Sequence, residues 1–131
     1  MNIIGIGTDM VSIERIESIW NRFGESFARR ILTPSETKAL KLTQTPISFL
    51  AKRYAVKEAV SKALGTGFRP DGLLLTEIGV INDELGRPHL ELLGRTSSEA
   101  QRRGVVESHI SLSDEREFAL AFVILCGENK S

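Results

Sequence analysis

A carboxylate near the end of a glycine-bearing segment is the first residue that could carry chemistry. Residues 2–11 alternate as expected for a strand, and one face of this strand carries Gly5, Gly7 and Asp9. Because glycine has no side chain, Asp9 is the functional group of that face. Glycine within a strand often marks the close approach of a ligand or of another backbone. The pattern indicates either an open notch that holds a carboxylate or a closely packed helix, with Asp9 beginning a turn.

A second carboxylate lies on a long predicted helix that begins at Thr45-Pro46 and ends before Gly65. Arg53 and Lys57 form a basic line along this helix. The alternative for Glu58 is a surface pair with Lys62, which would stabilise the helix by about 0.2–0.5 kcal/mol. Steps of three or four residues from Glu58 trace a face of mostly small side chains, namely Ala51, Tyr54, Ala55, Ser61, Lys62 and Gly65.

The two carboxylates, if folding brings them together, suit a magnesium ion. Mg²⁺ prefers oxygen ligands and is commonly held by one or two carboxylates together with substrate phosphates and water. Asp9 and Glu58 would supply the carboxylates, and Lys62 and Arg53 would neutralise phosphate charge. This combination is typical of phosphoryl-type transfer, in which positioning and charge stabilisation carry most of the catalysis.

The same two segments resemble the holo-acyl-carrier-protein synthase branch of the 4'-phosphopantetheinyl transferases. The first motif of that family, in GIGTDMVSIERI, is matched by Gly7, Asp9 and Arg15. The resemblance extends from end to end, which implies one phosphopantetheinyl transferase domain over residues 1–131. The second motif, in FLAKRYAVKEAVSKALGTG, is matched by Lys57, Glu58, Ala59, Lys62, Ala63 and Gly65.

The resemblance implies an enzyme that moves 4'-phosphopantetheine from coenzyme A to a serine of apo-acyl carrier protein, in fatty acid biosynthesis. Adenosine 3',5'-bisphosphate would leave. Asp9, Glu58 and Lys62 would be catalytic, with Mg²⁺ bound by Asp9 and Glu58. The serine proton would pass to Glu58 or to a water on the metal, and the sequence does not choose between them. The implied contacts to coenzyme A are Arg53, Ser61, Lys62, Gly65 and His109.

His109 belongs to the segment SHISLSDEREFALAFVI, which resembles the C-terminal hairpin of the family. Many relatives have a second histidine followed by threonine after this strand, where this chain has Ser113-Asp114. The resemblance implies that His109 contacts the nucleotide end of coenzyme A. The alternative is a hydrogen-bonded histidine at the edge of a sheet.

A docking surface for the carrier protein is expected on the first helical region. Arg15 lies in the matched motif, and the resemblance implies that it faces the carrier. An apolar patch ringed by arginines would suit an acidic helix that carries a few apolar residues. The alternative is that the apolar residues are core and the arginines are solvated. The residues of this predicted surface are Arg15, Ile19, Arg22, Phe27 and Arg30.

Composition is that of an ordinary soluble globular domain, with 41% hydrophobic and 26% charged residues and a net charge of zero. Residues 1–67 carry ten Lys or Arg against six Asp or Glu, which could steer an anionic partner or be chance segregation. We expect a cytoplasmic chain without a signal peptide. We expect neither nucleic acid nor a membrane as its partner. Other classes that remain are a module that only binds an acidic helical protein, and a nucleotide hydrolase.

The elements that must position these residues indicate an α+β fold, with a mainly antiparallel sheet packed on a long central helix. Thr33 to Glu36 is a capping box, and residues 73–93 read as a hairpin. Thr96 should open a short helix, with strands at 105–112 and 117–125.

The last strand is apolar on both faces, so a helix or another subunit must cover the second face. The family is typically trimeric, and we therefore expect a homotrimer.

Overall fold

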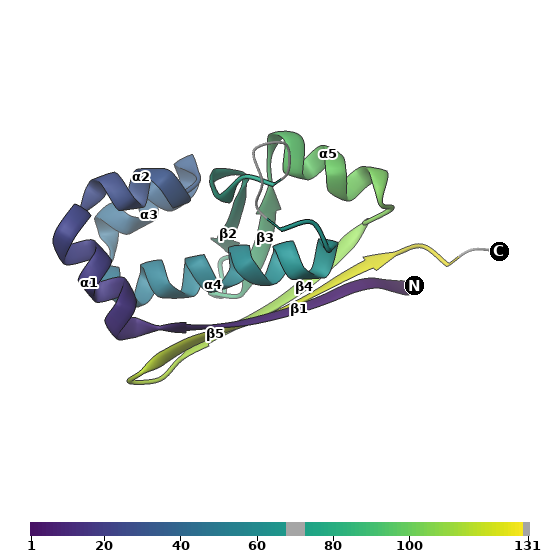
Figure 1. Ribbon diagram of the computed structural model, residues 1–131. Helices are drawn as coiled ribbons and strands as arrows, with labels where there is room; N and C mark the ends of the chain where they lie inside the picture. Colours follow the sequence, from purple (N-terminus) through teal and green to yellow (C-terminus); the bar gives the residue numbers. More distant parts are fainter. Residues whose placement is uncertain (68–72, 130–131) are drawn as a thin grey trace.

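A three-stranded antiparallel sheet and one long helix form the centre of the molecule (Figure 1). The computed structural model describes residues 1–67 and 73–129. The strand order is β1-β5-β4, and β2 and β3 form a separate hairpin. The strands are β1 (Asn2–Ser12), β2 (Ile78–Asn82), β3 (Pro88–Leu92), β4 (Glu107–Asp114) and β5 (Phe118–Gly127), and the helices are α1 (Ile13–Phe23), α2 (Glu25–Ile31), α3 (Pro34–Leu42), α4 (Pro46–Leu64) and α5 (Gly94–Arg102), with one 3₁₀ turn, η1 (Leu75–Glu77).

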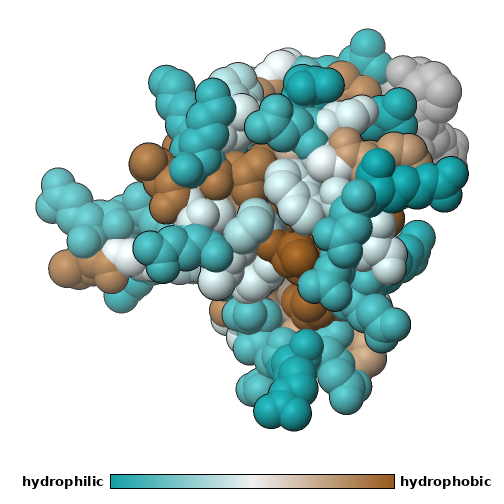
Figure 2. All heavy atoms as spheres, turned by 90° about the vertical axis from the view of Figure 1, so that its left-hand side faces the viewer, coloured by the Kyte–Doolittle hydropathy of each residue, from teal (hydrophilic) through white to brown (hydrophobic). Residues whose placement is uncertain are grey.

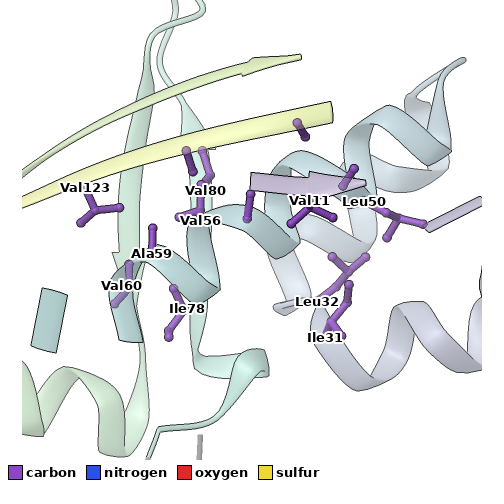
Figure 3. Close-up of a cluster of buried hydrophobic side chains, with 14 of the residues drawn as sticks. Val11, Ile31, Leu32, Leu50, Val56, Ala59, Val60, Ile78, Val80 and Val123 are labelled. Carbon is purple, nitrogen blue, oxygen red and sulfur yellow. The ribbon is translucent and has the colours of Figure 1, made fainter. Parts of the chain in front are cut away.

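Helix α4 lies along one face of the three-stranded sheet, with α1, α2 and α3 gathered at one end of the molecule (Figure 1). Its buried side chains Val56, Ala59 and Val60 lie between Val123 of β5 and the side chains of β2 (Figure 3). The helix is buried on most sides because it is surrounded by both β layers. The predicted α+β class, with a mainly antiparallel sheet packed on a long central helix, is confirmed. Among the described residues, no helix combines the length and apolar character that a membrane span needs.

Local capping sets where α1 and α3 begin and where α4 ends, as the sequence predicts. The Ser12 hydroxyl accepts a hydrogen bond from the Arg15 amide at 3.2 Å, and α1 begins at the next residue. Both halves of the capping box between Thr33 and Glu36 are present at the start of α3. Gly65 ends α4 with a φ of 73°, a left-handed conformation that glycine adopts without a steric penalty.

The start of α5 differs from the prediction. The helix begins at Gly94, two residues before Thr96, which was expected to open it. The cap comes instead from a distant side chain, because the Glu77 carboxylate accepts hydrogen bonds from the amides of Arg95 (3.1 Å) and Thr96 (3.2 Å). The Thr96 hydroxyl donates to the same carboxylate. A carboxylate at this position also complements the positive end of the helix dipole.

The glycine face of β1 packs directly on the backbone of α4. A Cβ atom at Gly7 would lie 1.8 Å from the Ala59 carbonyl oxygen, and one at Gly5 would lie 1.9 Å from the Ala63 carbonyl oxygen. Of the two interpretations of these glycines, the closely packed helix is therefore the one that the structure bears out. Asp9 does not begin a turn, because β1 continues to Ser12.

We expect Gly7→Ala to destabilise the fold by about 3 kcal/mol, at the upper end of the usual cost of overpacking, because the added methyl group meets rigid helix backbone. Urea unfolding followed by circular dichroism measures this loss. Gly86→Ala serves for comparison, since no atom lies within 4 Å of its Cβ position and its cost comes from its φ of 82° alone. If Gly7→Ala were no less stable than Gly86→Ala, β1 and α4 would not be packed this closely.

Strand β5 is apolar on both faces, as the sequence indicates. Ala119, Ala121 and Val123 are fully buried on the face toward α4. The opposite face exposes Phe118 (42% exposed) and Phe122 (49%). On β1 this outer face continues through two further apolar residues, Ile6 (62%) and Met10 (61%), which pair with Ile124 and Leu120.

Candidate active site

A pocket of about 470 Å³ lies where β1, α1, α2 and α4 meet. It contains both predicted metal ligands and three of the five residues predicted to bind the carrier protein. Figure 2 views the end of the molecule that α1, α2 and α3 form, where hydrophobic side chains lie among hydrophilic ones. The residues that line the pocket and enter the argument are Asp9, Arg15, Ile19, Phe27, Tyr54 and Glu58.

The packing of β1 on α4 explains how two carboxylates distant in sequence meet. Gly5 lies against Ala63 and Gly7 against Ala59, so each two-residue step along β1 matches about one turn of the helix. Asp9 is the next residue on the same face of β1, and the progression carries it toward the turn that bears Glu58. The glycines therefore set the distance between the two elements, and the carboxylate follows where they end.

Asp9 is paired with Lys62. The Lys62 ammonium nitrogen lies 2.9 Å from Asp9 Oδ1 and also donates to the Thr8 carbonyl at 2.9 Å. The side chain of Asp9 is only 17% exposed, whereas that of Lys62 is 54% exposed. The expected alternative, a surface pair between Glu58 and Lys62 along the helix, is not the arrangement found, because Lys62 reaches across to β1.

Tyr54 is a pocket residue whose function sequence reasoning missed. Burial, followed by the charge of Glu58 and a hydrogen bond to its carboxylate, raises the pKa of Tyr54 above its ordinary value. Both residues line the pocket, so the Tyr54 hydroxyl is a hydrogen-bond donor beside the Glu58 carboxylate. The signal in the sequence was its position four residues before Glu58, on the same helical face.

None of the five residues predicted to contact coenzyme A lines this pocket, and Lys62 is connected to it through its ion pair with Asp9. Arg53 is buried, and it lines a second pocket of about 480 Å³ on another side of α4, with Phe49, Asn82 and Gly86. The Ser61 hydroxyl is buried and donates to the Glu58 carbonyl at 2.7 Å. Gly65 lies exposed at the end of α4.

His109 lies on the sheet face that turns away from α4. It pairs in register with Ile124, whose neighbours Val123 and Leu125 are fully buried toward the helix. Its Nε2 atom is 3.5 Å from Glu107 Oε2, and both side chains are largely exposed. Asp9 pairs with Ala121 on the buried side of the same sheet. Within one chain, His109 and Asp9 therefore project from opposite faces.

The arginines predicted to bind the carrier protein are exposed. Arg15 lines the pocket beside Ile19 and Phe27, which are half-buried. Arg22 lies over the ring of Phe23, 5.1 Å from its centroid, and Arg30 is exposed on α2; neither lines the pocket. The structure thus joins part of the predicted docking surface to the two carboxylates.

The chemistry of the pocket fits a divalent cation that is completed by substrate. Within the described residues, no group of three or more His, Cys, Asp or Glu could enclose a metal ion. Two carboxylates in one pocket are nevertheless enough for Mg²⁺ when phosphate oxygens and water fill its other positions. The ammonium group of Lys62 already lies on Asp9, so a positive charge is accommodated there.

Comparison with known proteins agrees with this fold, which is that of a small α+β protein. The model of the 4'-phosphopantetheinyl transferase superfamily matches residues 5–123. The holo-[acyl-carrier-protein] synthase of Escherichia fergusonii is 50% identical over 125 residues, which cover 95% of this chain and 98% of the relative. The chain therefore belongs to the 4'-phosphopantetheinyl transferase superfamily and, within it, to the holo-[acyl-carrier-protein] synthases.

Solved structures of the same family share the fold. The synthase of Neisseria meningitidis has a TM-score of 0.88 at 42% identity, covering 94% of this chain and 98% of that one. The synthase of Bacillus anthracis, in complex with coenzyme A, has a TM-score of 0.80 at 34% identity, with coverage of 98% and 100%. The synthase of Helicobacter pylori, also in complex with coenzyme A, has a TM-score of 0.80 at 32% identity, with coverage of 92% and 99%.

Proposed function

We propose that this chain transfers 4'-phosphopantetheine from coenzyme A to a serine of apo-acyl carrier protein, with Mg²⁺ held by Asp9 and Glu58. The observation that carries the proposal is that Asp9 and Glu58 line one pocket, with Lys62 paired to Asp9. Membership of the synthase family supports the reaction, and the coenzyme A complexes of two relatives support the substrate.

In the reaction, the serine hydroxyl oxygen attacks the β-phosphorus of coenzyme A. The bond from that phosphorus to the bridging oxygen breaks, and adenosine 3',5'-bisphosphate leaves. Mg²⁺, when bound, supplies positive charge to the diphosphate oxygens. Lys62 contributes a further positive charge, and Tyr54 lines the same pocket as a hydrogen-bond donor beside the Glu58 carboxylate. Glu58 lies in the pocket as the candidate acceptor of the serine proton.

The decisive experiment is incubation of the chain with coenzyme A, magnesium and an apo-acyl carrier protein. We expect the mass of the carrier to rise by one phosphopantetheine group. Carrier binding without any mass change would favour a module that only binds. Breakdown of coenzyme A without carrier would favour a hydrolase. Omitting magnesium should stop the transfer, and restoring it should return the activity.

The carrier protein is proposed to dock on Arg15, Ile19 and Phe27, beside the carboxylates. Arg15→Glu should raise the KM for carrier protein sharply and leave the KM for coenzyme A nearly unchanged, because Arg15 is exposed and lies in the matched motif. Added salt should weaken the wild type in the same selective way, since exposed charges are screened beyond roughly 10 Å at 0.1 M ionic strength.

Lys38→Glu is the matched control, because it reverses another exposed positive charge, on α3 and outside the pocket. It should leave both KM values near those of the wild type. Equal effects of Arg15→Glu on both substrates, or an absence of salt dependence, would place the carrier on another surface.

The chain is also proposed to assemble as a closed trimer through the outer face of β1 and β5. Four exposed apolar side chains on one sheet face, Ile6, Met10, Phe118 and Phe122, support an interface. A neighbouring subunit would also account for His109, which could then reach a coenzyme A bound to the next chain. The location of the chain in the cytoplasm stays a prediction.

Light scattering at micromolar concentration should report the mass of three chains, and Phe122→Glu should shift it toward one chain. Leu42→Glu, which places the same charge on an apolar residue 85% exposed on α3, should leave the mass unchanged. A wild type that is monomeric at this concentration would contradict the assembly and any site shared between two chains.

A further inference from the structure

Lys62 is held on β1 by two oxygen atoms rather than pointing freely into solvent. Its ammonium nitrogen lies 2.9 Å from Asp9 Oδ1 and 2.9 Å from the Thr8 carbonyl oxygen. The ammonium group is a compact positive charge, and the two oxygen atoms beside it are the kind of ligand that a hard cation takes. The carboxylate that it engages is also the more buried partner, with 17% of the side chain exposed against 54% for Lys62.

This contact places Lys62 and a divalent cation in competition for the same carboxylate. Asp9 and Glu58 bring two negative charges into one pocket, and Lys62 neutralises one of them before any metal binds. A cation that binds Asp9 must displace the ammonium group or share Oδ1 with it at close range, which like charges resist. Because the lysine stem is flexible and half of the side chain is exposed, the ammonium can move away at low cost.

We propose that Lys62 is a resident counter-ion that occupies Asp9 until the divalent cation replaces it, and then moves to the coenzyme A diphosphate. The inference rests on the proposed function, which assigns Asp9 to the metal. Its consequence is coupling between the two ligands. Coenzyme A offers the displaced ammonium a new anionic partner, so it removes the competitor from Asp9. Metal and coenzyme A then strengthen each other's binding, and linkage makes this effect reciprocal.

The test measures binding of Mn²⁺, as a spectroscopic probe for the metal, by the intact chain with and without coenzyme A. Lys62→Met keeps the stem and removes the charge. Without coenzyme A, this variant should bind Mn²⁺ at least about threefold more tightly than the wild type, the scale expected for loss of a partly exposed ion pair. The factor by which coenzyme A tightens Mn²⁺ binding should be smaller in Lys62→Met than in the wild type.

Lys52→Met is the matched control. Lys52 lies on the same helix and forms a 3.4 Å ion pair with another carboxylate, Asp114, at 30% side-chain exposure. Its removal deletes the same charge away from the Asp9 pocket, so Mn²⁺ affinity without coenzyme A should not change. Asp9→Ala should abolish the tighter binding in the Lys62→Met background. Circular dichroism checks that each variant is folded.

Equal or weaker Mn²⁺ binding by folded Lys62→Met, or the same tightening in Lys52→Met, would overturn the counter-ion role. Failure of this inference is distinguishable from failure of the proposed function. If the wild type modifies its carrier while Lys62→Met binds Mn²⁺ no more tightly, the reaction stands and the counter-ion role falls. If the wild type binds Mn²⁺ through Asp9 but leaves the carrier unmodified, the proposed function falls instead.

Discussion

Replacing Asp9 or Glu58 with alanine is expected to abolish transfer of phosphopantetheine while leaving the chain folded. Each change removes one of the two carboxylates in the pocket. We expect turnover to fall by more than about a hundredfold, because even residues behind a metal ligand cost 10- to 100-fold when they are removed. The measurement is the rate of carrier modification at saturating magnesium.

The fold should tolerate these changes because neither carboxylate supports the core. Removing the Asp9 carboxylate leaves Lys62 without its ion-pair partner, but the Lys62 side chain is 54% exposed and its ammonium group can be solvated by water. The side chain of Glu58 lies in the pocket, and Ser61 bonds to its backbone rather than to its carboxylate. Glu128→Ala is the control, since it removes an exposed carboxylate near the C-terminal end and should keep full turnover.

Glu58→Gln separates the roles of this carboxylate. It keeps an oxygen atom that can bind a metal but loses the negative charge and the capacity to take a proton. If Glu58 accepts the serine proton, Glu58→Gln should be nearly as inactive as Glu58→Ala. A variant that keeps most of its rate would make Glu58 at most a neutral ligand. Wild-type turnover in Asp9→Ala or Glu58→Ala at saturating magnesium would remove the proposed metal site.

The largest effect on stability is expected from Glu36→Ala. Glu36 is 1% exposed, and its Oε1 accepts from Lys57 Nζ at 2.6 Å and from the Thr33 amide at 3.1 Å. Its Oε2 accepts from the Val80 amide at 3.1 Å and lies 3.5 Å from Arg53 Nε. One carboxylate thus connects α3, α4 and β2.

Removing Glu36 would leave two buried cations without their anion. Burial lowers the pKa of Lys57 and of Arg53, and the charge of Glu36 acts in the opposite direction on both. Lys57 has no exposed surface, and its other partner is the Ile78 carbonyl. Breaking a buried ion pair by deleting one partner costs about 3–5 kcal/mol, and we expect a loss of this size in the free energy of unfolding.

Chemical denaturation of the wild type and of three variants tests this expectation. Glu36→Gln with Lys57→Met removes the anion together with one of its two buried cations and should recover part of the stability lost in Glu36→Ala, because only Arg53 is then left without its anion. Glu99→Ala is the surface comparison, since Glu99 pairs with the partly exposed Arg102 and Arg103 and should cost at most about 1 kcal/mol. A loss in Glu36→Ala no larger than that in Glu99→Ala would contradict a structural role for the buried pair.

The sequence predicted most elements of the fold, because their signals are local, but it did not predict α2 or η1. The apolar alternation of β1, the capping box at Thr33 and the glycine at the end of α4 each involve residues within a few positions of one another. The start of α5 escaped prediction because its cap, Glu77, lies seventeen residues before Gly94 and is outside the helix. Motif spacing and family resemblance predicted Asp9 and Glu58 as a pair, and the structure places both in one pocket.

Tertiary structure alone decided which partners the charged residues of α4 take. Along the helix, Lys62 could pair with Glu58, and Arg53 and Lys57 could form a basic line. Instead Lys62 reaches Asp9 on β1, and Lys57 and Arg53 turn inward to Glu36. A helical repeat predicts which side chains share a face, but the carboxylate that meets each face is brought there by packing. For Lys62, that packing depends on two glycines of β1 that let the strand lie against the helix backbone.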